Sequence, residues 1–444
     1  MRRLLVPLTL ALCSGSAADA AQSGAIFPYK THVETLDNGL QVILVPMSSG
    51  GLLAYWTVVR TGSRDEYEPG HTGFAHFFEH MMFRGTEKFP SDVYNNITTK
   101  MGADANASTS DDLTAYHLGL AKEDLEKVME IESDRFQNLS YAEPAFQTEA
   151  GAVYGEYRKD KTDPFFTLEE ALHKVAFGTH TYSHTAMGFE ADIKAMPKMY
   201  DYSKSFFARY YRPENCVLVI AGELDVPATM ALARQYYGGW KRGYVEPRVP
   251  VEPPQTEERH LDVPYPGKSL PILWLAYKAD RFDPTDRTYV AGTLLAELAF
   301  GETSEIHKKL VLDEQVAEFI EAEVTPNRDP GLFDVLGRIK DPAKVDYVRS
   351  EIERVIDGCQ LSPPDAARLA DLKSRLKYSF LMNLDTPDHV AQSLARIIAV
   401  TGGIRAIDQL YTTYDSITPQ DVQAAARKYL VRERRTVAVL RGEK

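Results

Sequence analysis

The sequence predicts an α+β fold made of two homologous domains, each a mainly antiparallel sheet covered by helices. Strands that run into helices in blocks, without strict β-α alternation, favour separate layers of helix and antiparallel sheet. A proline-rich stretch divides the chain near its middle, and the segments that end the two halves resemble each other. A chain of 444 residues is also too long for one ordinary core.

The first twenty residues have the form of a secretory signal peptide. Two arginines precede an apolar run from Leu4 to Leu12, and small residues follow as far as Ala20. The run is too short to stay in a bilayer as a helix, so we expect cleavage after Ala20, no membrane span, and export of a soluble protein, which would be periplasmic if the source is a Gram-negative bacterium. Cys13 suggests a lipoprotein as the alternative, but Leu12 is larger than the residue that usually precedes a lipidated cysteine.

The net charge narrows the range of binding partners, and the two cysteines bear on whether the chain has a disulfide. The formal net charge is −13, which opposes binding to nucleic acids and anionic membranes because both need basic patches. Cys216 and Cys359 lie far apart in the mature sequence. Two free buried thiols are therefore favoured over a disulfide between them.

The proline-rich stretch sets the expected domain boundaries. Prolines crowd together between residues 243 and 266, and we interpret residues 243–256 as a linker between a first domain, 21–242, and a second, 257–444. Residues 211–223 and residues 431–443 both resemble a helix end, a short polar turn and a buried strand. A repeat of this length indicates duplicated domains.

Within the first half, the expected elements follow one another closely. A hairpin turn is expected at residues 35–40, because Asn-Gly is a strong turn signal. The remaining elements are strands at 41–45, 54–60 and 106–120, and helices near 91–101, 123–139 and 144–157, together with a helix in the stretch 71–86.

The stretch 71–86 carries the clearest chemical signal. His76 and His80 are four residues apart in an apolar helical pattern, so their imidazoles can converge on one zinc ion. Glu79 lies near the same face and can take a proton from a water that attacks a carbonyl. Ordinary buried histidines and a solvated glutamate are the alternative, but two histidines with this spacing around a glutamate favour the inverted H-x-x-E-H motif.

A catalytic zinc site needs a third protein ligand. Glu149 and Glu156 are seven residues apart, about two helical turns, so both project from one face of a helix. One of them can bind the metal while the other supports a ligand. The spacing does not say which one does so, and a solvated acidic face is the alternative.

The motif His76-x-x-Glu79-His80, followed by Glu156, resembles the pitrilysin/insulinase family of zinc metallopeptidases, in the short two-domain bacterial form that resembles subunits of mitochondrial processing peptidase. The resemblance implies one zinc ion per chain on His76, His80 and Glu156. It also implies Glu79 as general base and Glu149 as a supporting carboxylate.

Two further segments resemble the family. Residues 102–109 resemble its substrate-binding edge strand, and residues 180–182 with Gly188 resemble another family segment. An extended peptide can add to such an edge through main-chain hydrogen bonds. The resemblance therefore implies substrate binding along Ala105, Asn106, Ala107, Ser108 and Thr109.

The second half lacks the metal ligands. When Gly301 is aligned with Gly85, residues 292, 295 and 296 are glycine, leucine and alanine where the first half has its motif. Many complete family members also carry an arginine and a tyrosine in this half that grip substrate. Val311 and Glu318 occupy those positions here, with Arg328 as an outside candidate.

The sequence therefore predicts a zinc-dependent endopeptidase or oligopeptidase that hydrolyses peptides with metal-activated water. Family members of this length pair into larger chambers, so we expect a heterodimer with a homologous zinc-less subunit, with a homodimer as the alternative. A non-catalytic peptide-binding or structural subunit of the same fold is the alternative function. The intact set of His76, Glu79, His80 and Glu156 argues against it.

Overall fold

The computed structural model describes residues 25–443, so the predicted signal peptide lies outside the described residues. The first half is built on a six-stranded sheet with the order β1-β2-β6-β3-β5-β4. Only β2 and β6 are parallel, and β4 forms one edge. The strands are β1 (His32–Thr35), β2 (Gln41–Pro46), β3 (Leu52–Val59), β4 (Asp104–Thr109), β5 (Thr114–Ala121) and β6 (Cys216–Gly222).

The second half repeats this arrangement in a five-stranded sheet with the order β7-β11-β8-β10-β9, in which only β7 and β11 are parallel. Its order matches that of the first sheet from β2 to β4. This confirms the predicted α+β class and the duplication. The strands are β7 (Arg259–Tyr265), β8 (Ile272–Lys278), β9 (Ala317–Val324), β10 (Leu332–Ile339) and β11 (Arg435–Gly442).

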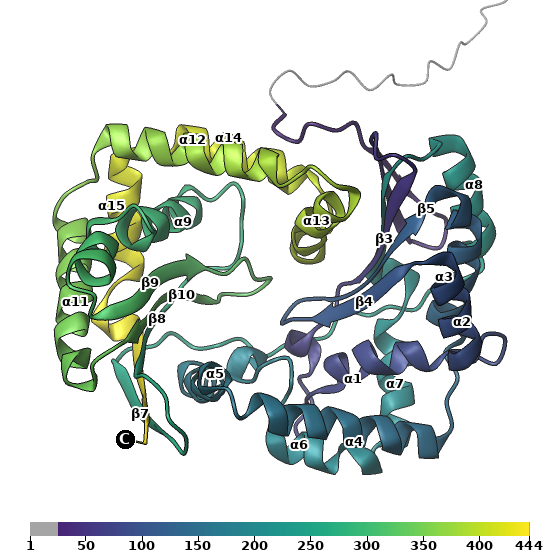
Figure 1. The fold of residues 1–444 in the computed structure, drawn as a ribbon, viewed down its shortest axis with the longest axis horizontal. Helices are drawn as coiled ribbons and strands as arrows, with labels where there is room; N and C mark the ends of the chain where they lie inside the picture. The colour runs from purple at the N-terminus through teal and green to yellow at the C-terminus, as the bar shows by residue number, and fades with distance from the viewer. Residues whose placement is uncertain (1–24, 444) are drawn as a thin grey trace, which may run out of the picture.

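Helices cover both sheets (Figure 1). The first half contains α1 (Phe74–Met81), α2 (Ser91–Met101), α3 (Leu125–Asn138), α4 (Glu143–Asp160), α5 (Pro164–Ala176), α6 (Glu190–Ala195), α7 (Tyr200–Tyr210) and α8 (Val226–Tyr237). The second half contains α9 (Arg287–Phe300), α10 (Glu305–His307), α11 (Val345–Leu361), α12 (Ala366–Met382), α13 (Pro387–Thr401), α14 (Arg405–Ser416) and α15 (Pro419–Tyr429). Among residues 25–443, no single helix is long and apolar enough to cross a membrane. Only α13 and α14 together pass that test, and they are bent by 90° from each other.

Most of the expected elements appear within a few residues of their predicted bounds, but the single strand predicted at 106–120 is wrong. The chain forms two antiparallel strands there, β4 and β5, which pair with each other. The polar run Ser110-Asp111-Asp112 makes the turn between them, and the backbone N–H of Ser110 donates to the carbonyl oxygen of Leu113 at 2.9 Å. The turn places β4 at the edge of the sheet.

Each half supplies a helix that covers the sheet of the other half. Helix α13 packs on the first sheet and α5 on the second, as Figure 1 shows. The α13 contact joins Val390, Leu394 and Ile398 to strand residues that include Val45, Trp56 and Val219. The α5 contact joins Leu168, Leu172 and Ala176 to strand residues that include Ile272, Ala438 and Leu440. The two halves therefore share apolar cores.

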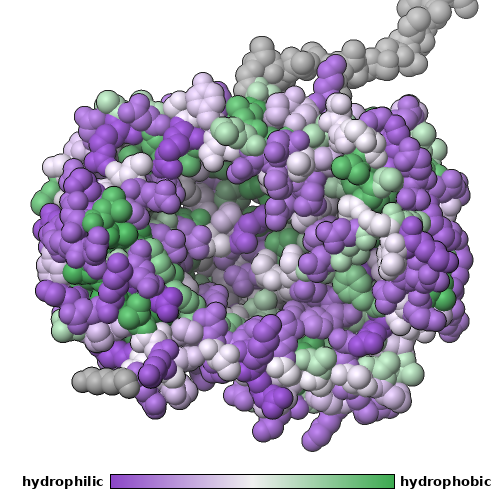
Figure 2. Space-filling model, in the orientation of Figure 1, coloured by the Kyte–Doolittle hydropathy of each residue, from purple (hydrophilic) through white to green (hydrophobic). Residues whose placement is uncertain are grey.

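A polar network fixes the β9–β10 loop of the second half to the first half. Arg64 donates from Nε to Asp329 at 2.6 Å, and His180 contacts the same carboxylate at 3.0 Å. Tyr182 donates to Asp112, which also accepts from the backbone N–H of Arg328. Although burial opposes ionisation, hydrogen bonds from His180 and Arg64 lower the pKa of Asp329. Between the joined halves the molecular surface is hollowed (Figure 2).

Candidate metal centre and active site

Helix α1 is held at its N-terminus by a buried carboxylate. Glu66 accepts from the backbone N–H groups of Gly73 at 2.7 Å and Ala75 at 2.6 Å. These are donors that the helix itself leaves unpaired. Burial raises the pKa of Glu66 to about 8, and the hydrogen bonds from these donors oppose that rise. Phe74, Phe77 and the other apolar residues of α1 are buried in the first core. The opposite face of the helix is thereby fixed toward the hollow between the halves.

Gly73 makes this position of α1 possible. Its φ is +88°, a left-handed conformation, and an added Cβ would lie 2.7 Å from the carbonyl oxygen of Met187. We expect Gly73→Ala to lower the free energy of unfolding by roughly 2–4 kcal/mol, because conformational strain adds to a clash with backbone. Gly70→Ala is the matched control, since Gly70 has φ +82° but open space around it. If thermal or denaturant unfolding shows the same loss of stability for both variants, the short distance between Gly73 and the carbonyl oxygen of Met187 is unimportant.

The structure brings His76, His80 and Glu156 together. One ligand atom from each lies within 4.8 Å of the others, and within residues 25–443 this is the single group of three or more such residues with that property. Nε2 of His80 is 3.1 Å from Oε2 of Glu156, and Nε2 of His76 is 3.7 Å from the same oxygen. Burial lowers the pKa of His76 to about 3, so its imidazole is neutral near pH 7. A neutral imidazole is the form that binds metals.

Glu149 holds the other side of the His80 ring. Its Oε1 is 3.1 Å from Nδ1 of His80, and its second oxygen accepts from Nε of Arg84. Burial opposes ionisation of Glu149, but these hydrogen bonds outweigh it and lower the pKa of the carboxyl. The contact leaves Nε2 of His80 directed at Glu156. Of the two glutamates left open by sequence spacing, Glu156 is thus the one beside both histidines, and Glu149 supports one of them.

Glu79 is connected to the edge strand. Thr109, the last residue of β4, donates from Oγ1 to Oε2 of Glu79 at 2.6 Å. Burial raises the pKa of Glu79, while the hydrogen bond from Thr109 and the charge of His80 oppose that rise. A carboxyl with a raised pKa is better matched to accepting a proton from water near neutral pH.

The five residues expected to bind substrate lie on β4. Within residues 25–443 this strand pairs on one side with β5, and it forms an edge of the sheet on the other. Ser108 and Thr109 line a pocket that also includes His76 and Glu79, whereas Asn106 and Ala107 line a second pocket beside His80 and Arg84. Ala105 lines neither pocket and packs against the first core.

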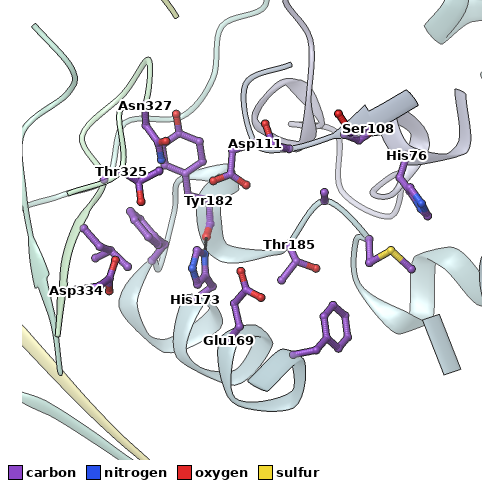
Figure 3. Close-up of a pocket in the computed structure, with 18 of the residues that line it drawn as sticks. His76, Ser108, Asp111, Glu169, His173, Tyr182, Thr185, Thr325, Asn327 and Asp334 are labelled. Atoms are coloured by element: carbon purple, nitrogen blue, oxygen red, sulfur yellow. Dashed lines mark hydrogen bonds between the residues drawn. The ribbon is translucent and has the colours of Figure 1, made fainter. Parts of the chain in front are cut away.

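The larger pocket has a volume of about 540 Å³ and takes its walls from both halves. Figure 3 shows side chains from α5, from the β4–β5 turn and from the second sheet gathered around it. Sequence reasoning missed many of the lining residues, and the charged or titratable ones among them include Asp111, Glu169, His173, Glu323, Asp334 and Arg396. Asp111 follows the predicted edge strand by two residues. The others come from α5, α13 and the strands β9 and β10, which meet only because α5 and α13 each pack on the sheet of the other half.

The second half lines the pocket, but the residues aligned with the zinc motif of the first half cannot bind a metal. Leu295 and Ala296, aligned with Glu79 and His80, are buried in α9. Val311 packs on the second core, and Glu318 is exposed on β9, so neither lines the larger pocket. Arg328 is occupied elsewhere, because it donates to the carbonyl oxygen of Arg60 and to Glu246.

Comparisons with known proteins agree with this architecture. The family model "Insulinase (Peptidase family M16)" matches residues 48–189, and "Peptidase M16 inactive domain" matches residues 199–376. Zinc protease PqqE of Helicobacter pylori is 26% identical over 99% of both chains. The beta subunit of mitochondrial-processing peptidase from Bos taurus is 25% identical over 93% of this chain and 84% of its own.

The crystal structure of a protease from Helicobacter pylori superposes with a TM-score of 0.87 and 25% identity, covering 93% of this chain and 99% of that chain. The two family models follow each other along the chain. The first spans β3 to β5, and the second begins at residue 199 and spans β6 to β10. This chain belongs to the insulinase family of peptidases, family M16.

Proposed function

We propose that this chain is a zinc-dependent endopeptidase that cleaves extended peptides. The observation that carries the proposal is the convergence of His76, His80 and Glu156 beside Glu79, at a pocket bordered by an edge strand. Two imidazoles and one carboxylate are a typical donor set for catalytic zinc, which uses three protein ligands and one open position. The neutral state of His76 and the support of His80 by Glu149 suit such a site. When bound there, zinc would activate a water and polarise the scissile carbonyl.

The side chains of this protein would do the remaining work. Glu79 Oε1 is free of the hydrogen bond that Thr109 makes to Oε2, so it can accept the proton of the attacking water and deliver it to the leaving amine. The outer edge of β4 would hold the peptide backbone as an added strand. Because the hydrogen bond of Thr109 joins β4 to Glu79, the bound peptide and the base would keep a fixed relation to each other.

We further propose that the zinc-bearing chain works with a homologous zinc-less subunit, with a homodimer as the alternative arrangement. Val311 and Glu318 do not line the pocket, and Arg328 donates to the carbonyl oxygen of Arg60. These three positions therefore supply no hydrogen-bond donor to a bound substrate, and a partner subunit would have to supply one. A relative named as the beta subunit of a processing peptidase agrees with pairing. The signal-like sequence of residues 1–20 supports export to the periplasm.

The first test is peptide cleavage by the purified mature chain, measured with a quenched-fluorescence peptide mixture and with bound zinc quantified in the same sample. We expect about one zinc per chain and cleavage that a chelator abolishes and added zinc restores. One zinc per chain with cleavage only after addition of a homologous subunit would support the heterodimer. A chain that binds no zinc would overturn the proposal in favour of a non-catalytic subunit.

A further inference from the structure

The linker between the two halves turns one carboxylate inward. Residues 243–256 form no helix or strand, and many of them are exposed. Val251 is 84% exposed, and Pro253 and Pro254 are exposed as well. The side chain of Glu252, between them, is only 8% exposed. A glutamate is rarely buried in this way unless donors hold its carboxylate.

Three backbone N–H groups hold Glu252. Gly178 donates to Oε1 at 2.8 Å, while Thr179 and His180 donate to Oε2 at 2.8 and 2.9 Å. These residues begin the α5–α6 loop, residues 177–189, and within residues 25–443 none of the three N–H groups has a backbone acceptor. Although burial opposes ionisation, the three hydrogen bonds lower the pKa of the Glu252 carboxyl. The linker thus supplies the acceptor that this turn of the loop lacks.

Two cations of the second half lie beside this contact. Nζ of Lys278 on β8 is 3.9 Å from Oε1 of Glu252, and it lies above the ring of Phe177. Burial lowers the pKa of Lys278 to about 7, and the charge of Glu252 opposes that fall. Arg259 on β7 donates to the carbonyl oxygens of the last two residues of α5, where a positive charge is favourable. The end of α5 and the start of the loop are therefore bound to both the linker and the second sheet.

The turn that Glu252 holds lies against the larger pocket. Phe177 and Tyr182 line that pocket, and Figure 3 shows Tyr182 at its wall. Nδ1 of His180 accepts from the backbone N–H of Tyr182 at 3.0 Å, and Nε2 contacts Asp329 of the second half at 3.0 Å. A shift of the turn would therefore move the pocket wall through residues that Glu252 does not touch.

We propose that Glu252 is a positioning residue of the peptidase, which fixes the first turn of the α5–α6 loop and, through Phe177 and Tyr182, the shape of the pocket that receives substrate. Glu252 itself lines neither pocket. The middle of the loop is fixed independently, because Tyr182 donates to Asp112. Loss of Glu252 would thus displace the turn without unfolding the domain. The proposal rests on the proposed peptidase function.

The first test does not depend on catalysis. In Glu252→Gln a neutral amide replaces the carboxylate, and it accepts the three hydrogen bonds more weakly. We expect hydrogen–deuterium exchange in a proteolytic fragment that covers residues 177–181 to be about tenfold faster, with α4 unchanged. Glu257→Gln removes the same charge from an exposed residue shortly after the linker, so it is the matched control and should exchange like the unchanged chain. Unchanged exchange in Glu252→Gln would overturn the proposal.

The second test separates positioning from stability. It uses the chain in the form that cleaves peptides, alone or with its partner subunit. We expect Glu252→Gln to raise KM about tenfold while kcat stays within about twofold, because a displaced pocket wall weakens substrate binding and leaves the metal ligands and Glu79 in place. Zinc content should stay near one per chain. Lys278→Met keeps the three N–H donors of Glu252 and should raise KM less.

The other outcomes are equally decisive. Faster exchange with unchanged KM would show that Glu252 fixes the loop without shaping the pocket, which would overturn the proposal. A joint fall of kcat, zinc content and Tm would show a purely structural role and would also overturn it. If even the unchanged chain cleaves no peptide, the peptidase function fails, and fluorescence anisotropy of a labelled peptide mixture then decides. Weaker binding to Glu252→Gln than to Glu257→Gln would support the role of Glu252 at the pocket, and equal binding would overturn it.

Discussion

Replacement of Glu79 by glutamine is expected to leave zinc bound and to lower kcat by about 10²–10⁴-fold. Glutamine has nearly the shape of glutamate, so it can keep the contact with Thr109 Oγ1, but it does not accept a proton from water near neutral pH. Because Glu79 is not one of the three grouped ligand residues, the zinc content should stay close to one per chain. The measurements are kcat with a fluorogenic peptide and metal content by atomic emission.

Glu87→Gln is the matched control for this variant, because Glu87 is exposed a short distance along the chain and lines neither pocket. Its kcat should equal that of the unchanged protein. Retention of full turnover by Glu79→Gln would rule out the role of Glu79 as general base. Loss of zinc from that variant would instead show that Glu79 contributes to the metal site itself.

The second large effect separates Glu156 from Glu149. We expect Glu156→Gln to lose zinc and all measurable cleavage, because its carboxylate lies 3.1 Å and 3.7 Å from the Nε2 atoms of the two histidines. Glu149→Gln should still bind zinc, with affinity reduced about 10–100-fold, because Glu149 contacts the His80 ring at Nδ1 and not at the Nε2 atom that lies beside Glu156. Zinc dissociation constants from competition with a chromogenic chelator measure the difference.

Both glutamates lie on α4, so Glu143→Gln on the same helix is the control for effects of charge alone. It should bind zinc like the unchanged chain. If Glu149→Gln loses zinc while Glu156→Gln keeps it, the assignment of ligand and supporting residue is reversed. Circular dichroism on all three variants separates loss of metal from loss of fold.

Local spacing predicted each pair of residues at the candidate metal centre, and the family resemblance implied that the two pairs meet. His76 and His80 are one turn apart on α1, and Glu149 and Glu156 are two turns apart on α4, so helical geometry fixes each pair. The packing of α1 against α4 then brings the pairs together. Their roles as ligands, base and support remain proposals that the variants above test.

The pocket beyond Glu79 had no such local signal. Glu169, Glu323 and Asp334 stand on three different elements, and each looks like an ordinary polar residue in the sequence. They meet because α5 crosses to the second sheet, a long-range contact that no hydrophobic period encodes. The break between β4 and β5 was missed for a different reason, since the apolar and small residues on both sides conceal a short polar turn.

Because α5 and α13 each pack on the sheet of the other half, a truncation that removes one half also destabilises the half that remains. A fragment that ends before β7 would contain His76, His80 and Glu156, yet it would lack α13 and leave one apolar face of its sheet in water. Exposing several large aliphatic side chains costs about 1.5–3 kcal/mol each, which together approaches the whole stability of a domain. The smallest unit for mapping function is therefore the complete pair of halves. A substitution at Leu394 is in effect a substitution in the core of the half that holds the metal ligands.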